Sequence, residues 1–210
     1  MPDNETDARR GRGRPRTFDP GDVLDTVIEV FWELGYERSD TETLSKRTGL
    51  TKPSLYNAFG AKEDLFVAAI ERYRETRSKI SLLALTQSDT PREGIENYFL
   101  SLAENVAGDG HPKGCLIFSV AMPLCDRLPK VAAALESAPK ESSARLMAYF
   151  GREIDRGRLP PEFDCAAATS LVQDLTAAMI MQARAGAPLT MLTGKAKRNT
   201  ELVLFAGGAS

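Results

Sequence analysis

Residues 44–62 concentrate side chains that can contact a polyanion. This stretch, LSKRTGLTKPSLYNAFGAK, holds four cations and no acid, with Tyr56 and Asn57 near its middle. Lysine and tyrosine can donate hydrogen bonds to phosphate oxygens. Asn57 has the side chain best suited to read adenine, and Lys52 suits guanine. Because local basic surfaces predict nucleic-acid contact better than total charge does, the stretch predicts a DNA-binding surface.

The N-terminal 17 residues carry a second basic cluster. Residues 9–16 (RRGRGRPR) have a local charge of +5, whereas the whole chain has a net charge of -2 and a pI near 5.6. The Gly/Pro-rich composition predicts a disordered basic arm over residues 1–17. Arginines on such a backbone suit a narrow minor groove, so Arg12, Arg14 and Arg16 are expected to bind DNA. A tail that only solubilises the chain is the alternative.

The three cysteines, Cys115, Cys125 and Cys165, are odd in number and widely spaced. They predict neither a disulfide framework nor a zinc site, and they suit a reducing compartment. Cys115 follows Gly114 at an expected helix start, where the helix dipole can lower a thiol pKa and favour redox or electrophile sensing. His111 could serve Cys115 as a base, but no third orienting group accompanies the pair. We therefore expect no enzyme, cofactor or metal site, and we keep thiol sensing as an alternative.

Short helices are expected to position the basic stretch. Asp19 and Pro20 predict the start of a helix whose apolar stripe continues to Gly35, where it should end. Ser39 and Asp40 compete as caps of the next helix. Gly49 then permits a sharp turn before a helix that Thr51 caps. These proportions are typical of a helix-turn-helix.

The rest of the chain also shows helical patterns and no convincing strand. We expect an all-α fold of about nine helices, the later ones over residues 62–85, 91–107, 115–125, 129–156 (interrupted near Pro139), 164–185 and 188–205. The stretch 115–125 is apolar on all sides and should be central. The predicted organisation is a disordered arm (1–17), a DNA-binding domain (18–66) and a larger ligand-binding and dimerisation domain (67–210).

Aromatic and methionine side chains of the third region suit an adaptable apolar pocket, although they equally suit a plain core. The candidate ligand-binding residues are Phe99, Cys115, Phe118, Met122, Met147, Phe150 and Met179. The polar N-terminus lacks a secretory signal, and no apolar run has the length that a bilayer requires. We therefore expect a cytoplasmic protein without membrane contact.

Residues 19–66 resemble the DNA-binding domain of the tetracycline-repressor (TetR/AcrR) family. The matching positions are Phe31, Gly35-Tyr36, Leu44, Gly49-Leu50-Thr51, Leu55-Tyr56, Phe59 and Lys62-Glu63-Asp64-Leu65-Phe66. The resemblance implies a homodimer that pairs through the eighth and ninth helices (164–185 and 188–205). It implies that the third helix reads a palindromic double-stranded DNA operator, and that a small-molecule inducer binds among the fourth to eighth helices.

By position in that motif, the expected DNA contacts are Thr51, Lys52, Ser54, Tyr56 and Asn57, with Lys62 contacting a phosphate at a helix N-terminus. Two positions depart from the family pattern. Asp40 replaces a threonine that contacts phosphate, so Ser39 is expected to take that contact. Ala58 replaces a histidine, and the basic arm is expected to compensate for both changes.

The sequence thus predicts a ligand-responsive transcriptional regulator, a repressor that a small-molecule inducer releases from its operator. Three alternatives remain open: a thiol-based sensor acting through Cys115, a cysteine-dependent enzyme, and a non-specific architectural DNA-binding protein.

Overall fold

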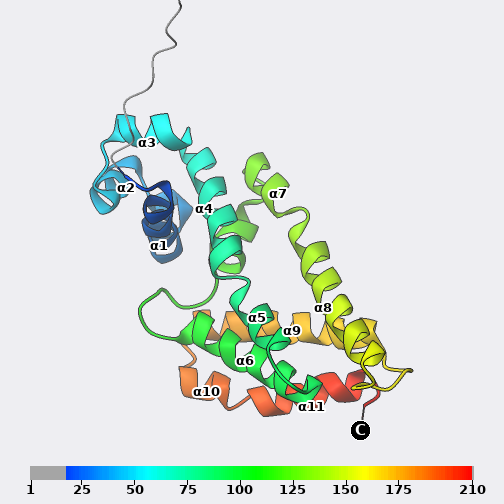
Figure 1. Cartoon of the computed structure of the whole chain (residues 1–210). Coiled ribbons are helices and arrows are strands. Elements are labelled where there is room, and N and C mark those ends of the chain that lie inside the picture. The colour runs from blue at the N-terminus through cyan, green and yellow to red at the C-terminus, as the bar shows by residue number, and fades with distance from the viewer. Residues whose placement is uncertain (1–17, 210) are drawn as a thin grey trace, which may run out of the picture.

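The computed structural model describes residues 18–209, and within this range it is helical with no strand. The N-terminal bundle consists of α1 (Pro20–Arg38), α2 (Thr41–Thr48), α3 (Lys52–Phe59) and the first half of α4 (Lys62–Thr76). Figure 1 shows α3 at the end of the molecule opposite the C-terminal helices. The all-α fold with an N-terminal helix-turn-helix is therefore confirmed.

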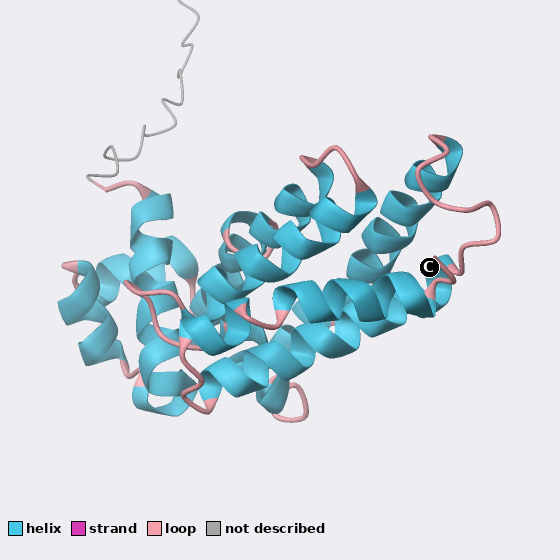
Figure 2. Ribbon diagram, turned by 90° about the horizontal axis from the view of Figure 1, so that it is seen from below, coloured by secondary structure: helices cyan, strands magenta, loops and turns pink. Residues whose placement is uncertain are grey.

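The remaining helices form a larger C-terminal part. In chain order they are α5 (Ile80–Thr86), α6 (Pro91–Ala107), the π-helical turn η1 (Ile117–Ala121), the 3-10 turn η2 (Met122–Leu124), α7 (Pro129–Leu135), α8 (Ala138–Asp155), α9 (Cys165–Arg184), α10 (Leu189–Thr193) and α11 (Ala196–Ala206). Figures 1 and 2 show α6, α9 and α11 packed along one another. Each of the nine predicted helices thus corresponds to one element or to a consecutive pair.

Helix α1 begins as predicted and bends where it was expected to end. The Asp19 carboxylate accepts a hydrogen bond from the Gly21 backbone at 2.6 Å, and Pro20 occupies the first turn. Gly35 has a φ of +77°, which residues other than glycine rarely adopt. Helical residues continue beyond it to Arg38. Gly35 therefore makes a kink rather than the end of the helix.

The prediction of a single helix over residues 62–85 is wrong. Helix α4 ends at Thr76, and α5 starts at Ile80 in a new direction. The Arg77 carbonyl accepts a hydrogen bond from the Asn105 side chain of α6 at 3.3 Å, which helps to satisfy the end of α4. Gly94 of α6 lets α5 lie close, because a Cβ there would be 2.6 Å from the Leu85 carbonyl. This packing favours the break.

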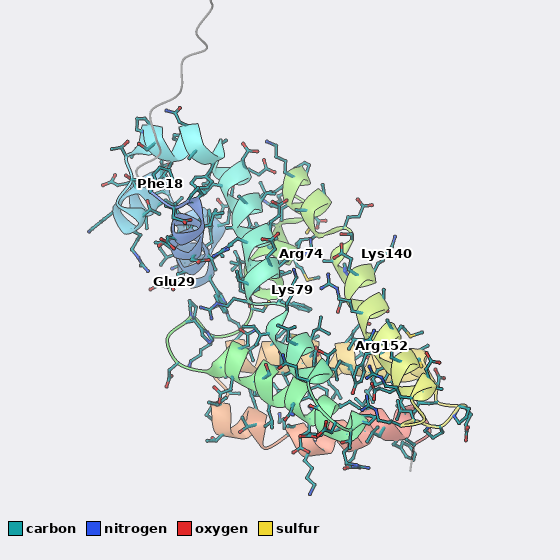
Figure 3. The ribbon with its side chains drawn as sticks, in the orientation of Figure 1. Phe18, Glu29, Arg74, Lys79, Lys140 and Arg152 are labelled. Atoms are coloured by element: carbon teal, nitrogen blue, oxygen red, sulfur yellow. The ribbon has the colours of Figure 1, made fainter. Side chains whose placement is uncertain are left out.

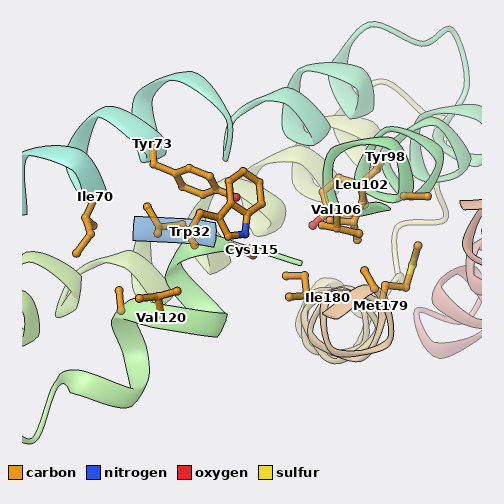
Figure 4. Packing of buried hydrophobic residues seen from close by; sticks show 14 of the residues in the cluster. Trp32, Ile70, Tyr73, Tyr98, Leu102, Val106, Cys115, Val120, Met179 and Ile180 are labelled. Atoms are coloured by element: carbon orange, nitrogen blue, oxygen red, sulfur yellow. The ribbon is translucent and has the colours of Figure 1, made fainter. Parts of the chain in front are cut away.

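One hydrophobic core joins the N-terminal bundle to the C-terminal part. Trp32 of α1 is fully buried and meets Tyr73 of α4 edge-to-face, with ring centroids 5.3 Å apart. Figure 4 shows these rings beside Cys115, with Val106 of α6 and Ile180 of α9 to their right in the same core. The two parts of the chain are therefore packed against each other rather than connected by a free linker.

Two other expectations about the C-terminal part need correction. The segment 115–125 is buried on one face only, because Phe118 and Met122 on its other face are 41% and 48% exposed. The predicted helix over 188–205 is divided at Gly194 and Lys195 into α10 and α11. The predicted interruption near Pro139 is present, since α7 ends at Leu135 and α8 begins at Ala138.

Candidate DNA-binding interface

The turn between α2 and α3 is fixed by backbone geometry and side-chain caps. Gly49 adopts a left-handed conformation (φ +71°) directly after α2. The Thr51 side chain then caps α3 by accepting a hydrogen bond from the Ser54 backbone at 3.3 Å. Leu44 of α2 and Leu55 of α3 are both 2% exposed and anchor the two helices in the core. The helix-turn-helix therefore presents α3 in one defined orientation.

The outer face of α3 carries the side chains predicted to contact DNA. Thr51, Lys52, Tyr56 and Asn57 are exposed, and Tyr56 has 46% of its surface accessible. Ser54 is half-buried, and its hydroxyl lies 2.9 Å from that of Thr51. These exposed polar groups share one helix with no acid in its first turn. The arrangement suits insertion of α3 into a major groove.

Thr41, the first residue of α2, is a candidate contact that the sequence prediction missed. Its hydroxyl lies 2.9 Å from the Tyr56 hydroxyl. The first backbone N–H groups of a helix lack intrahelical partners and favour phosphate, so Thr41 occupies a place where phosphate can bind. The available signal was its position directly after the cap residue Asp40. The structure thus unites the start of α2 and the middle of α3 in one hydroxyl-bearing surface.

The predicted phosphate contact from Ser39 is wrong. Ser39 is completely buried, and its hydroxyl donates to the Gly35 carbonyl at 2.6 Å. Gly35 kinks the end of α1, and the Ser39 hydroxyl turns back onto that helix, where the Gly35 and Val30 carbonyls are the acceptors within reach of its one proton. The hydroxyl is therefore unavailable to DNA.

Of the two residues predicted to compete as the cap of α2, Asp40 is the one that caps it. Its carboxylate accepts a hydrogen bond from the Thr43 backbone N–H at 2.8 Å. This bond lowers the pKa of Asp40 below its ordinary value. At neutral pH a charged carboxylate therefore stands beside Thr41, where it would repel an approaching phosphate.

Lys62 lies at the start of α4 but is partly engaged by its own bundle. Its ammonium lies 4.4 Å from the centroid of the Tyr36 ring, within the range of a cation–π interaction. Partial burial lowers the pKa of Lys62, and the nearby Glu37 and Asp40 carboxylates oppose that shift. The lysine is thus held in place beside the α3 surface.

Residues of the C-terminal part neutralise acids near Lys62. Arg127 donates to the Glu37 carboxylate at 2.7 Å, and Lys130 forms an ion pair with Asp64. These pairs are exposed, so each contributes little to stability. They nevertheless reduce negative charge near the expected phosphate position. Arg12, Arg14 and Arg16 of the predicted arm lie outside the described residues.

The seven residues predicted for a ligand pocket do not share one environment. Phe99, Phe150, Met179 and Cys115 are buried in the core, whereas Phe118, Met122 and Met147 are 38–48% exposed. The last three therefore lie on the surface rather than around an enclosed cavity. None of the seven lines the open groove that the structure forms between α1 and η2.

The environment of Cys115 contradicts the predicted lowering of its pKa. Burial raises the pKa of this thiol, and the nearby Tyr73 hydroxyl only partly opposes that shift. His111 does not pair with it in the described structure; its ring stacks on Trp32, with centroids 5.3 Å apart. The nucleophile–base pair that the cysteine-dependent enzyme alternative requires is therefore not formed in this part of the chain. Within residues 18–209, side chains make no cluster suited to a metal ion, and no helix there could cross a bilayer.

Residues 23–69 match the family model described as bacterial regulatory proteins of the tetR family. The HTH-type transcriptional repressor ComR of Escherichia coli (strain K12) is 28% identical over 185 residues, which cover 88% of each chain. The uncharacterized HTH-type transcriptional regulator YezE of Bacillus subtilis (strain 168) is 29% identical over 150 residues, covering 71% of this chain and 77% of YezE.

A similar solved structure extends the match through most of the fold. A cysteine mutant of the TetR family transcriptional regulator CifR, complexed with 26-bp double-strand operator DNA, superposes with a TM-score of 0.81. It is 27% identical, and the match covers 90% of this chain and 98% of CifR. The helix-turn-helix geometry, the family model and these relatives agree: residues 23–69 form a DNA-binding domain of the tetR-family type, and the chain as a whole is similar to TetR family transcriptional regulators.

Proposed function

We propose that this chain is a homodimeric repressor that binds a palindromic operator and is released by a small-molecule inducer. The observation that carries the DNA-binding part is the exposed face of α3, where Lys52, Tyr56 and Asn57 stand clear of the core. The operator complex of CifR and the repressor ComR, both similar to this chain, support the same conclusion.

In the proposed complex, α3 enters a major groove. Lys52 and Asn57 contact base edges, whereas Thr41, Thr51, Ser54, Tyr56 and Lys62 contact the phosphate backbone. Arg12, Arg14 and Arg16 of the N-terminal arm add minor-groove contacts. Residues 18–66 serve as the DNA-binding domain, and residues 67–210 carry the ligand and dimer functions.

Exposed apolar side chains on α9 and α11 support the proposed dimer. Met181 is 70% exposed, Leu202 is 42% exposed and Phe205 is 80% exposed. Large apolar side chains in water on two neighbouring helices mark an interaction surface. A second copy of the same surface would cover them in a two-fold arrangement. The dimer would place two copies of α3 on the two half-sites of a palindrome.

Release by an inducer would be a shift between two conformations. An inducer acts when it binds better to the conformation whose α3 helices no longer match half-sites one helical turn apart. Trp32 of the N-terminal bundle and Ile180 of the C-terminal part belong to one packed core. A conformational change in the C-terminal part can therefore alter the position of the N-terminal bundle. The thiol-sensing alternative lacks a comparable observation, because burial raises the Cys115 pKa.

The proposal is tested with purified protein and two duplexes of equal length and composition. One duplex is the palindrome upstream of the gene itself or of its neighbour, and the other has the same bases scrambled. Fluorescence anisotropy at fixed salt should give at least about a thousandfold tighter binding to the palindrome. Equal affinities would identify a non-specific DNA-binding protein and contradict the proposal.

A further inference from the structure

The end of α1 and the segment η1–η2 line an open surface groove of about 300 Å³. Its lining includes the apolar side chains of Leu34, Tyr36, Val120 and Leu124, and the two arginines Arg38 and Arg184. The volume lies at the lower end of the range for small-molecule sites. The groove combines residues of the N-terminal bundle with residues of η1, η2 and α9, so an occupant would touch both parts.

The charges around the groove favour an anion. In the described part of the chain, neither Arg38 nor Arg184 forms an ion pair with a carboxylate. Glu37 also lines the groove, but its carboxylate is engaged by Arg127 at 2.7 Å. The groove therefore offers two uncompensated guanidinium groups beside an apolar wall.

Local geometry holds both arginines at the groove. The Arg38 Nε donates to the Leu34 carbonyl one turn earlier at 3.0 Å, which fixes the side chain along α1. The stem of Arg184 lies against the backbone of Gly114, because a Cβ on Gly114 would be 3.2 Å from the Arg184 Cβ. A bare glycine thus lets an arginine from α9 reach the segment before η1. Two arginines from different elements therefore line one groove.

We infer that this groove binds a small amphipathic carboxylate. The apolar tail lies along Leu34, Val120 and Leu124, and the carboxylate accepts charge-assisted hydrogen bonds from Arg38 and Arg184. Binding brings α1 and the η1–η2 segment into contact with one molecule, so it biases their relative position. The consequence for operator affinity rests on the proposed function, whereas the binding itself does not.

The binding is tested by calorimetry on the full-length protein without DNA. Three probes share one chain length: octanoate, octan-1-ol and octylamine. Octanoate should bind with a Kd of about 1 mM or tighter. Octan-1-ol should bind at least about tenfold more weakly, since it lacks the charge, and octylamine no better than the alcohol.

Substitutions then locate the site. Arg38→Gln and Arg184→Gln should each weaken octanoate binding by about tenfold and leave octan-1-ol binding unchanged. Arg152→Gln is the matched control, because Arg152 is an exposed arginine on α8, remote from the groove, and should retain the wild-type affinity (Figure 3). All three side chains are exposed, so thermal melting should confirm folded variants.

Two results would overturn the inference: no binding of octanoate, or equal octanoate affinity in the wild type and both groove variants. The second result would place the probe elsewhere, for example in the core. A failure to bind any palindromic duplex would contradict the proposed function instead, and it would leave the calorimetric result standing.

Discussion

The Tyr56 hydroxyl of α3 lies 2.9 Å from the Thr41 hydroxyl at the start of α2. Each hydroxyl carries one proton, so when one donates to the other, the second proton remains free. The pair can therefore donate to a phosphate oxygen while it also connects the two helices. This contact links the packing of the helix-turn-helix to its expected DNA-binding surface.

Tyr56→Phe and Thr41→Val should each weaken operator binding by about tenfold or more. Each substitution removes one hydroxyl of the pair that donates a hydrogen bond to a charged phosphate. Stability should change by less than about 0.5 kcal/mol, since neither side chain lies in the core. Anisotropy titrations and thermal melts measure the two effects. In the double variant the losses should be less than additive, as expected for partners in one pair.

Thr86→Val is the matched control for the hydroxyl substitutions, since Thr86 is exposed at the end of α5 and far from α3. It should bind the operator like the wild type. Wild-type affinity in both Tyr56→Phe and Thr41→Val would remove the hydroxyl pair from the interface.

Lys62→Gln should reduce the salt dependence of operator binding. Each phosphate contact releases counterions, so losing one should lower the slope of log affinity against log salt by about 1 per subunit. Lys79→Gln removes the same charge between α4 and α5 and serves as the control (Figure 3). If both variants keep the wild-type slope, Lys62 contacts Tyr36 and not DNA.

Asp40→Ser should strengthen operator binding while it keeps the cap of α2. Serine can cap the helix as aspartate does, but it brings no negative charge near the phosphate. The gain should be roughly threefold to tenfold at low salt and should shrink at high salt, where charges are screened. Anisotropy at two salt concentrations measures it. Unchanged or weaker binding at both would show that the carboxylate does not oppose DNA.

The Asp40 carboxylate should also make the stability of the fold depend on pH. The Thr43 backbone N–H lowers the pKa of Asp40 below 3.8 in the folded chain. The cap therefore stabilises the fold above that ordinary value, and its contribution is lost as pH falls through the lowered pKa. Melting temperatures from neutral to strongly acidic pH should fall less steeply in Asp40→Asn than in the wild type. Parallel curves would contradict this assignment.

Phe205→Glu should convert the proposed dimer to monomers. The ring is 80% exposed on α11, so the substitution costs the isolated chain little, whereas two new charges would face each other in a two-fold interface. Light scattering after size exclusion measures the mass. Leu83→Glu on α5 also places a charge at an exposed apolar position, and it should remain dimeric. A monomeric wild type, or a dimeric Phe205→Glu, would move the interface elsewhere.

Local signals in the sequence were sufficient for the N-terminal bundle. Asp19, Asp40 and Thr51 cap the helices where their side chains predicted, and Gly49 makes the left-handed turn. These features depend on residues within a few positions of each other, so a single sequence contains them. Helix α6 was predicted with its bounds, residues 91–107, for the same reason.

Features that depend on distant contacts were not predictable. The break between α4 and α5 involves Asn105, which is far away in the sequence. The burial of Ser39 depends on the kink at Gly35, because the Ser39 hydroxyl turns back there to donate to the Gly35 carbonyl. Local sequence patterns do not reveal this contact. Composition also could not separate core from surface, since Phe118 and Phe99 are equally apolar but only Phe99 is buried.

The central claim is that α3 reads a palindromic sequence. It is tested most directly by selecting bound sequences from a random duplex library with the wild type, Asn57→Ala and Lys52→Ala. The wild type should enrich an inverted repeat with half-sites about one helical turn apart, and each variant should lose preference at defined positions of the half-site. No enriched repeat, or the same repeat with all three proteins, would contradict the claim.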